Sequence, residues 1–319
     1  MKVLITGGAG YIGSTIASCC ADNGITPVIL DDYSTGLRLF AQRFDHYEGD
    51  IADADLLAQI AADHPDISAV VHCAARIVVP ESVDQPLEYY DNNVAKSIAL
   101  LRSLERAGIT RVILSSTAAL YEPGPDYMVD EDCALEPQSP YAASKLMVER
   151  VLEDAAQAGI LTALTLRYFN PIGADPQLRT GLQNPHPTHA MGKMIEAHTT
   201  GTPFTITGVD WPTRDGSGLR DYVHVWDLAR AHVAALTLFD DPLQPPYNTI
   251  NLGTGQGTTV FELAEAFGEA TGTPLEIRTR RPGKATWSAL LRASRRLSRS
   301  LGGSRSDPSP TGCEMRCCG

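Results

Sequence analysis

The sequence predicts an α/β protein, built as a doubly wound parallel sheet with a smaller C-terminal lobe interleaved with it. Three observations lead to this prediction. A glycine-rich turn follows the first apolar run, apolar runs alternate with helix-like segments through the first half, and the chain becomes rich in loops after Pro171. The expected divisions are 1–170 for the first domain, rejoined by about 221–253, then 171–283 for the second lobe and 284–319 for a tail.

Buried parallel strands are expected where a short apolar run is bounded by turn residues. These runs are 3–6, 28–30, 69–72, 112–115 and 163–166. Helices are expected over the amphipathic segments between them, which are 12–23, 54–63, 94–107 and 142–158. Repeated strand–helix–strand units place helices on both faces of a parallel sheet, which is the Rossmann-like arrangement.

The loop-rich region after Pro171 opens the second lobe, in which a helix is expected over 190–199 and a strand over 204–207. A further helix is expected over 225–238, followed by an apolar run at 249–252. This run has the composition of a buried strand, so we expect it to rejoin the first sheet. The chain then leaves the first domain and returns to it, which makes the two lobes interleaved.

The tail from Lys284 differs in composition from the rest of the chain. It holds seven basic and two acidic residues and three of the seven cysteines, and its end is rich in Ser, Pro and Gly. Its apolar period is weak. Such a segment is expected to be a basic, disordered tail.

Composition excludes some classes of protein. The chain has 319 residues, enough for two modest cores that share a cleft, and its 26 basic against 38 acidic residues argue against nucleic acid as the main partner. The sequence runs from Met1 straight into the glycine turn, and no apolar stretch reaches spanning length, so we expect a cytoplasmic protein without a membrane partner. The cysteines are odd in number and form no paired metal-ligand clusters, which fits a reducing compartment and predicts no metal site.

The glycine turn carries the strongest functional signal. Gly7, Gly10 and Gly13 lie between the first expected strand and the first expected helix, with Tyr11 and Ile12 between the last two. Glycines in this position let the backbone approach a pyrophosphate, and the helix N-terminus directs amide groups at its charge. A similar turn can merely connect a strand to a helix, but here strand, helix and a following acidic residue are all in register. We therefore predict that a dinucleotide binds here.

The second expected strand ends at Asp31 and Asp32. A carboxylate in this position accepts hydrogen bonds from the adenosine ribose hydroxyls and repels a 2′-phosphate, which predicts NAD as the cofactor. Arg38 lies nearby and keeps NADP open as the alternative. Asp50 and Ile51 close the next strand-like stretch, and we expect them to flank the adenine.

The catalytic prediction rests on Tyr141 and Lys145. They lie four residues apart at the start of an expected helix, so both project from one face, and Pro140 before them suits a first helical turn. A neighbouring ammonium and a positive nicotinamide ring favour the phenolate, which lowers the pKa of Tyr141 and makes it a usable base. The preceding strand ends at Thr117, which we expect to hold the substrate oxygen. Without the glycine turn, this Tyr and Lys would indicate only a surface pair.

The chain resembles the extended short-chain dehydrogenase/reductases, and within them the UDP-glucose 4-epimerase family. The matching motifs span most of residues 1–283. Besides the glycine turn with Tyr11-Ile12-Gly13, they are Pro86-Leu87-Glu88-Tyr89-Tyr90-Asp91-Asn92-Asn93, Ser139-Pro140-Tyr141, Lys145-Leu146-Met147-Val148-Glu149, Arg167-Tyr168-Phe169-Asn170-Pro171 and Arg220-Asp221-Tyr222-Val223-His224-Val225.

This resemblance implies epimerisation at carbon 4 of a UDP-hexose, in which NAD takes a hydride from carbon 4 and returns it to the opposite face of the keto sugar. It implies that Tyr141 is the base, that Lys145 holds the ribose, and that Thr117 orients the 4-hydroxyl. Asn170 and Arg220 are implied to grip the nucleotide diphosphate, a charge that suits an arginine. Further cofactor contacts are implied for Ala74, Ala75, Asn92 and Phe169. A homodimer is implied as well.

The sequence departs from the family's pattern near both expected ligands. Ile77 stands where the family often has a lysine near the nicotinamide, and the neighbouring Arg76 is either its substitute or unrelated to it. Thr188 and His189 stand where many members have paired asparagines against the nucleotide. His189 is therefore a candidate substrate contact, with an exposed loop residue as the alternative.

The tail is the largest departure. Members of the family continue past the region of Arg281 with an ordered segment that supplies another diphosphate-binding Arg and a residue that controls N-acetyl sugars, and neither is found in this sequence. The abrupt change at Lys284 leads to the hypothesis of a reading-frame shift, natural or from sequencing. Translating the gene in its other frames tests it, and the hypothesis fails if no family-like ending appears.

Two other functions stay open. A nucleotide-sugar dehydratase or decarboxylase shares the scaffold, but a dehydratase needs an extra acid and base directly after the active-site Thr, where this chain has Ala118 and Ala119. A catalytically impaired NAD-binding homologue is favoured by the abnormal tail and disfavoured by the presence of Thr117, Tyr141 and Lys145.

Overall fold

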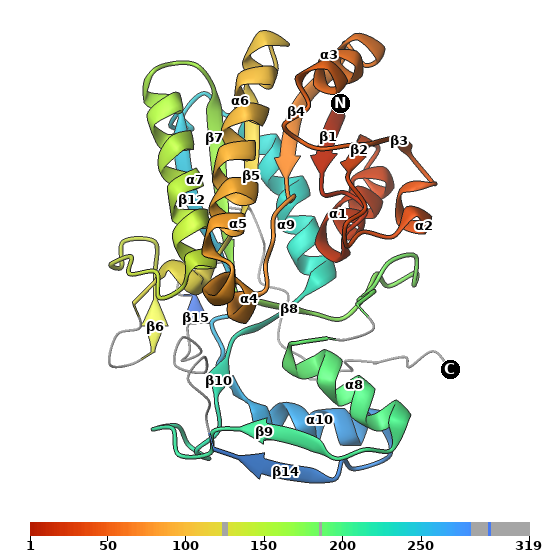
Figure 1. Ribbon diagram of the computed structural model, residues 1–319, viewed down its shortest axis with the longest axis vertical. Coiled ribbons are helices and arrows are strands. Elements are labelled where there is room, and N and C mark those ends of the chain that lie inside the picture. The colour runs from red at the N-terminus through yellow and green to blue at the C-terminus, as the bar shows by residue number, and fades with distance from the viewer. Residues whose placement is uncertain (123–126, 185–186, 282–292, 295–319) are drawn as a thin grey trace.

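The computed structural model describes residues 1–122, 127–184, 187–281 and 293–294. Its centre is a seven-stranded sheet in which all neighbouring strands are parallel, in the order β12-β7-β5-β4-β1-β2-β3. The strands are β1 (Lys2–Thr6), β2 (Thr26–Asp31), β3 (Asp45–Glu48), β4 (Ile67–His72), β5 (Arg111–Thr117), β7 (Thr162–Tyr168) and β12 (Tyr247–Leu252). Successive strands run outward from β1 in both directions, which confirms the predicted doubly wound sheet (Figure 1).

Helices cover both faces of the sheet. The α3 (Ala54–Asp63), α6 (Lys96–Arg106) and α7 (Pro140–Gln157) helices lie on one face, and α1 (Tyr11–Asp22) and α9 (Val225–Leu238) lie on the other (Figure 1). Alternation along β1 explains the two layers, because successive side chains of a strand point to opposite faces. Val3 and Ile5 pack in the cluster of α1 and α9, whereas Leu4 packs in the cluster of α3, α6 and α7.

Short elements lie in the connections that follow the carboxyl ends of the parallel strands. They are α2 (Arg38–Ala41), α4 (Val79–Asp84), α5 (Pro86–Tyr90), the π-helix η1 (Asp91–Ala95) and the 3₁₀-helix η2 (Ala118–Leu120). The expected helix over 94–107 therefore begins with a π-turn, which the apolar pattern did not reveal. The buried Asn93 gives the physical reason, because its side chain bonds to two other segments from this wider turn.

A second, smaller core lies beyond the carboxyl edge of the sheet (Figure 1). It is built from α8 (Ala190–Thr200), β9 (Phe204–Thr207), α10 (Val260–Thr271) and β14 (Ile277–Arg280). Strands β9 and β14 pair in parallel, and the apolar side chains of Met194, Phe204, Ile206, Leu263 and Phe267 pack together. The predicted helix and strand of this region are confirmed, whereas α10 was not predicted.

Paired short strands link the two cores. Strand β8 (Asn170–Ile172) pairs in parallel with β11 (Tyr222–His224), and β10 (Leu219–Arg220) pairs antiparallel with β13 (Thr258–Thr259). The chain leaves the sheet through β8, returns through β11 to α9 and β12, and leaves again toward α10. The two cores are thus interleaved along the chain.

The tail predicted over 284–319 lies outside the described residues, apart from β15 (Ala293–Ser294), which pairs with β6 (Met128–Val129). The hypothesis of a reading-frame shift concerns the same residues and stays a hypothesis. Within the described ranges, no helix has both the length and the apolar character needed to cross a bilayer.

Candidate active site

The glycine turn joins β1 to α1 at the edge where the parallel strands end. Gly7 has a φ of +69°, a left-handed conformation that favours glycine, and a side chain there would lie 2.7 Å from the amide nitrogen of Ala74. A side chain on Gly13 would lie 2.3 Å from the carbonyl oxygen of Gly7. Gly10 caps α1 without a side-chain hydrogen bond, so the first amides of the helix are available to an anion. The turn therefore fits the pyrophosphate of a dinucleotide.

Asp31 joins the end of β2 to this turn. Its carboxylate accepts hydrogen bonds from the backbone nitrogens of Ala9, at 2.9 Å, and Tyr33, at 2.8 Å. Burial raises the pKa of Asp31, and these two hydrogen bonds oppose the rise. The neighbouring Asp32 accepts two hydrogen bonds from Ser34, at 2.9 and 2.6 Å. Two carboxylates thus stand beside the turn, where an adenosine ribose would lie.

Arg38 has a partner of its own and does not face the turn as a free cation. Its guanidinium donates two hydrogen bonds to Glu48, at 2.6 and 2.5 Å, and lies 4.3 Å from the centre of the Tyr33 ring. A 2′-phosphate would have to compete with Glu48 for this cation. The geometry therefore favours NAD over the alternative, NADP.

Asp50 and Ile51 follow β3. The Asp50 carboxylate accepts a hydrogen bond from Lys96 at 2.5 Å and one from the backbone nitrogen of Ala52 at 2.9 Å. Ile51 is buried in the core with Leu57. Asp50 is thus occupied by an ion pair that the sequence did not indicate, and its expected contact with adenine stays a prediction.

The catalytic candidates meet at the carboxyl end of β5. Ser139 caps α7 by accepting a hydrogen bond from the amide of Ala142 at 3.2 Å, which fixes the first turn of the helix. Tyr141 and Lys145 follow on that turn and are only 9 % and 4 % exposed. The Lys145 ammonium donates to the carbonyl oxygen of Ser115 at 2.9 Å. The Tyr141 phenol lies near enough to the side chain of Thr117 for that side chain to lower its pKa.

Burial controls the protonation of this pair. It raises the pKa of Tyr141 to about 12, and the side chain of Thr117 only partly opposes the rise. Burial also lowers the pKa of Lys145 to about 8, against the opposing influence of Cys73 and Glu149. The sequence prediction of a lowered pKa for Tyr141 is therefore wrong for the protein without its cofactor, because desolvation of the phenolate dominates.

Asn93 braces the catalytic helix from the π-helix η1. Its amide accepts a hydrogen bond from the backbone nitrogen of Arg76 at 2.8 Å, and it donates to the carbonyl oxygen of Arg76 and to the Ser144 hydroxyl, both at 3.0 Å. Ser144 in turn donates to the carbonyl oxygen of Tyr141 at 2.7 Å. Asn92 donates to Asn93 at 3.1 Å. The sequence predicts a cofactor contact for Asn92 and gives no sign of this role of Asn93.

A buried ion pair fixes the same helix from the other end. Arg167 on β7 binds Glu149 on α7, with 2.6 Å between Nη2 and Oε2, and both side chains are buried. The Ser116 hydroxyl of β5 also donates to Glu149. Strands β5 and β7 thus hold the helix that carries Tyr141 and Lys145.

Arg76, the candidate substitute for the family's lysine, is paired with acidic side chains of its own region. Its guanidinium lies 2.5 Å from Glu81, 3.7 Å from Glu88, and 5.5 Å from the centre of the Tyr89 ring. The charge is therefore used within the α4–α5 region. Ile77 next to it is 62 % exposed.

The link from the catalytic edge to the second core is short. Thr117 on β5 lies opposite Tyr168 on β7, and β8 begins two residues later at Asn170. Asn170 lies opposite Tyr222 on β11, and its side-chain amide donates to the carbonyl oxygen of Asp221 at 3.2 Å. Between Tyr168 and Asn170, Phe169 is buried in the main core. Arg220 directly precedes Asp221. The pairing of β8 with β11 therefore links Arg220 to the end of β7, which lies beside Thr117.

A pocket of about 630 Å³ opens in the second lobe. Its walls come from α8, β9, the segment before β10 and the start of α10. Its basic lining residues are Arg220, Arg280 and Lys193, the last of which pairs with the lining residue Glu196 at 2.7 Å. The Arg220 guanidinium donates to the carbonyl oxygen of Leu219 at 2.7 Å, and no ion pair among the described residues includes it. Burial lowers the pKa of Arg220. A half-buried cation that pairs with no carboxylate among the described residues suits an anionic ligand.

His189 has a structural task at the mouth of this region. Its ring Nδ1 accepts a hydrogen bond from the backbone nitrogen of Gly192 at 3.3 Å and so caps α8. The adjacent Thr188 lines the pocket, whereas His189 is not among the lining residues. The substrate contact expected of His189 therefore stays a prediction.

Residues 173–183, which we call the strap, run along α1 outside the catalytic edge. The Tyr11 hydroxyl donates to the carbonyl oxygen of Gly173 at 2.6 Å. Arg179 donates to both oxygens of Asp22, at 2.7 and 2.8 Å, and to the fully buried Asp175, at 2.5 and 3.1 Å. The strap thus ties both ends of the helix that follows the glycine turn.

Comparisons with known proteins agree with this geometry. The model of the NAD dependent epimerase/dehydratase family matches residues 3–253. The UDP-glucose 4-epimerase of Azospirillum brasilense is 44% identical over 288 residues, which cover 88% of this chain and 81% of the relative. That of Yersinia pestis is 39% identical over 324 residues, 94% of each chain. The crystal structure of UDP-glucose-4-epimerase from Stenotrophomonas maltophila, with bound NAD and formylated UDP-arabinopyranose, superposes with a TM-score of 0.88 at 36% identity, over 96% of this chain and 94% of that one.

Proposed function

Because this chain belongs to the NAD-dependent epimerase/dehydratase family, we propose that it interconverts UDP-galactose and UDP-glucose by inverting carbon 4 of the hexose. One observation carries this proposal. Thr117, Tyr141 and Lys145 meet at the sheet edge that also holds the glycine turn, and the Arg220 pocket lies directly beyond it. In this proposal, one sugar nucleotide contacts the base Tyr141, the anion site at Arg220, and NAD bound at the glycine turn, which accepts the hydride.

In the proposed reaction, Tyr141 takes the proton of the 4-hydroxyl and later returns it. Thr117, whose side chain lies near Tyr141, orients that hydroxyl. NAD, when bound, supplies the hydride acceptor and donor. The glycine turn with Asp31 and Asp32 would hold its adenosine diphosphate half.

Lys145 supplies the charge that this base requires. With the pKa of Tyr141 raised to about 12, deprotonation at neutral pH needs a positive neighbour. The pKa of Lys145 is lowered only to about 8, so its ammonium predominates at neutral pH. Its hydrogen bond to the carbonyl oxygen of Ser115 holds the ammonium at the end of β5.

The second lobe is suited to the nucleotide. A pocket of about 630 Å³ falls in the size range of small-molecule sites. We assign Arg220 to the diphosphate because it lines the pocket, is half-buried, and can donate in a fork to two phosphate oxygens. Asn170, two residues after Tyr168, would contact the same ligand from β8.

The alternatives find less support. A dehydratase would need an acid and a base after Thr117, where η2 instead carries Ala118 and Ala119. The impaired homologue was favoured by the tail, which lies outside the described residues, whereas the catalytic triplet is assembled. The relatives compared above are named as epimerases.

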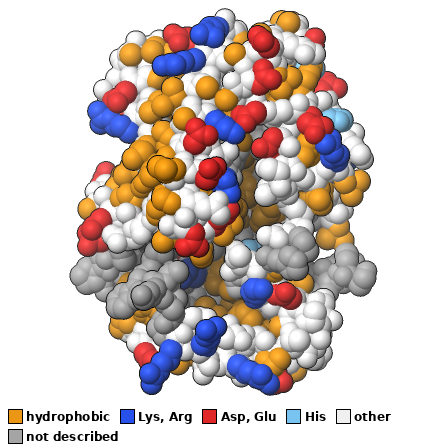
Figure 2. Space-filling view, viewed as in Figure 1, with side chains coloured by type: hydrophobic (Ala, Val, Ile, Leu, Met, Phe, Trp, Pro, Cys, Tyr) orange, Lys and Arg blue, Asp and Glu red, His pale blue; other side chains and the backbone are white. Residues whose placement is uncertain are grey.

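We propose a homodimer and a cytoplasmic location as well. Leu87 on α5 is 80 % exposed, and Val83 and Met147 beside it are also exposed (Figure 2 shows this apolar patch over α5 and α7). A second copy of the chain would cover this patch, and light scattering on Leu87→Lys should then report a monomer. Cys19 and Cys73 are among the cysteines that carry free thiols, which supports a reducing compartment.

The decisive experiment supplies the purified protein with UDP-galactose and follows UDP-glucose. Epimerisation is expected, and Tyr141→Phe should abolish it while the fold and the NAD content stay unchanged. A 4-keto-6-deoxy product would instead establish a dehydratase. Bound NAD without any turnover would establish the impaired homologue, and full activity of Tyr141→Phe would refute the assigned base.

A further inference from the structure

Arg220 depends on its backbone for its position in the pocket. Among the described residues, no ion pair includes it, and its guanidinium donates a hydrogen bond to the carbonyl oxygen of its own neighbour Leu219. The charged end is thus tied, within the described residues, to the backbone of its own strand. The strand that carries Arg220 must therefore define where the cation is presented.

That strand is held through the start of α10. Leu219 and Arg220 of β10 pair with Thr259 and Thr258 of β13, and Thr259 is also the N-cap of α10. Thr259 and Glu262 form a capping box, in which the backbone nitrogen of each donates to the side chain of the other, at 2.8 and 3.2 Å. The helix end is therefore a fixed support for the strand.

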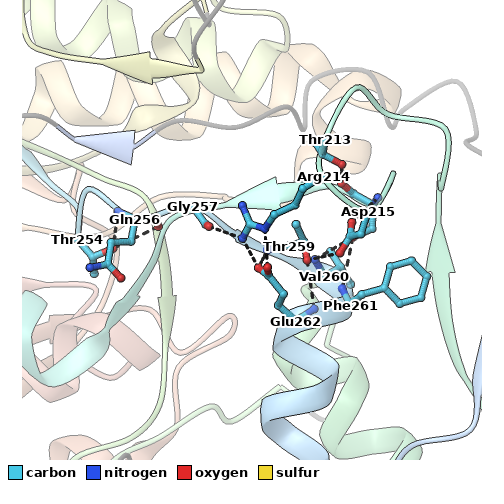
Figure 3. Close-up of polar contacts among 11 residues, drawn as sticks. Thr213, Arg214, Asp215, Thr254, Gln256, Gly257, Thr259, Val260, Phe261 and Glu262 are labelled. Carbon is cyan, nitrogen blue, oxygen red and sulfur yellow. Dashed lines mark hydrogen bonds and ion pairs between the residues drawn. The ribbon is translucent and has the colours of Figure 1, made fainter. Parts of the chain in front are cut away.

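Asp215 fastens the segment before β10 to the same support (Figure 3). Its carboxylate accepts hydrogen bonds from the Thr259 hydroxyl at 2.5 Å and from the backbone nitrogen and the hydroxyl of Ser217, both at 2.8 Å. The buried Ser217 hydroxyl accepts in turn from the backbone nitrogens of Val260, at 3.1 Å, and Phe261, at 3.3 Å. One carboxylate thus joins both sides of the β10–β13 pair.

A second contact lies nearby, and its charged side chains are exposed, as Asp215 is. Arg214 binds Glu262 through two hydrogen bonds and donates to the carbonyl oxygen of Gly257 at 2.8 Å (Figure 3). The two charged side chains are 49% and 40% exposed, so water screens their attraction. The carboxylate of Asp215 accepts three hydrogen bonds from two segments and joins them independently of this ion pair.

We propose that Asp215 is a positioning residue for substrate: by tying segment 215–217 to the N-terminus of α10, it sets the place at which β10 presents Arg220 to a nucleotide diphosphate. The proposal rests on the proposed function only through the assignment of Arg220 to the diphosphate. Gly218 and Val260 line the pocket on either side of this tie, so the constraint acts at the pocket wall itself.

The test measures binding of UDP and of uridine by calorimetry to the full-length protein with its NAD. Asp215→Asn keeps the shape of the side chain but removes its charge and replaces one of its two acceptor oxygens with an amide donor. Its dissociation constant for UDP should rise about tenfold, as expected when hydrogen bonds to a charged group are lost, while that for uridine changes less than about twofold. KM for the sugar nucleotide should rise with little change in kcat.

Two further variants complete the design. Glu276→Gln removes an exposed carboxylate paired with Arg278 in the same lobe and should bind UDP as the unmodified protein does. Arg220→Ala should weaken UDP binding, and adding Asp215→Asn to it should cause no further loss, because the two residues act as one unit.

Unchanged UDP affinity in Asp215→Asn would overturn the proposal, as would an equal loss for UDP and uridine or additive losses in the double variant. If Arg220→Ala itself binds UDP normally, the assignment of Arg220 fails first, and this result is separate from the others. Should Asp215→Asn not fold, Ser217→Ala replaces it, with the same selective loss of UDP affinity expected. If Ser217→Ala binds UDP as tightly as the unmodified protein does, that result counts against the proposal.

Discussion

The Lys145 ammonium on α7 donates a hydrogen bond to the carbonyl oxygen of Ser115 on β5, at 2.9 Å and almost fully buried. A helix and a strand are joined here by the group whose charge, in the proposed mechanism, supports the base. Because a carbonyl oxygen accepts but does not carry a full charge, burial is only partly compensated, and the pKa of Lys145 falls to about 8. The charge state of the catalytic centre therefore changes close to physiological pH.

We predict that turnover falls as the pH rises above about 8, because the ammonium is lost through its lowered pKa. Lys145→Arg keeps a positive charge throughout this range and should lose activity overall but show a flat alkaline limb. The measurement is kcat between pH 6 and pH 10 on protein with its NAD content verified. An equally steep alkaline fall in Lys145→Arg would assign that titration to another group.

Gly13 and Gly10 should respond differently to a methyl group. On Gly13 it would lie 2.3 Å from the carbonyl oxygen of Gly7, whereas on Gly10 the same distance would be 3.3 Å. Gly13→Ala should therefore destabilise the fold by about 1–3 kcal/mol, the usual cost of overpacking. Gly10→Ala should cost less stability and mainly weaken NAD binding, since this position faces the approaching pyrophosphate. Thermal unfolding and NAD titration distinguish the two, and equal losses in both assays would contradict this division.

Two buried histidines should make the fold sensitive to acid. Burial lowers the pKa of His72 to about 3 and that of His232 to about 4. Below pH 6.5 the unfolded chain therefore binds protons that the folded chain does not, so stability falls as the pH falls toward 4. Each histidine should contribute about 1.4 kcal/mol per pH unit in this window.

Urea unfolding at pH 7, 6 and 5 measures this dependence. His232→Asn should reduce the slope, whereas His46→Asn, at an exposed position, should leave it as steep as in the unmodified protein. The same slope in all three proteins would show that His232 does not carry the effect.

Arg179 should be the critical residue of the strap. It is the ion-pair partner of Asp175, which is fully buried, and it also binds Asp22 on α1. Arg179→Ala leaves the buried carboxylate without its cation, so a loss of about 3–5 kcal/mol is expected. Arg278→Ala removes an exposed ion pair and should cost less than about 1 kcal/mol. Similar shifts of the melting temperature in both variants would contradict the importance of the strap.

Sequence patterns predicted the elements whose own residues determine them. Helix α9 has the predicted bounds of 225–238, and β9 has those of 204–207, because each combines a clear apolar period with turn residues at its ends. Strand β3 reads Asp-His-Tyr-Glu and has no such period, since it lies at the sheet edge and only its pairing with β2 makes it a strand. The π-helix η1 depends on the distant partners of Asn93 and has no local signal.

The candidate site divides in the same way. Thr117, Tyr141 and Lys145 were found because their types and spacing carry the chemistry. The pairing of Asp50 with Lys96 and the contacts of Asp215 with Thr259 join residues far apart in the chain, which spacing does not reveal. The raised pKa of Tyr141 was missed because desolvation depends on packing around the phenol, which only the folded structure supplies.

The hydrogen-bonded pair of β8 and β11 has a consequence for building chimaeras from related chains. Because the second lobe is inserted between these strands and then continued after β12, exchanging it requires two separate inserts in one gene. The two junctions of the first insert must lie at paired positions of β8 and β11, for instance at Asn170 and Tyr222. Otherwise these two strands would lose their pairing between the lobes. A chimaera built with a single insert would contain only part of the second lobe, and therefore only part of the nucleotide pocket.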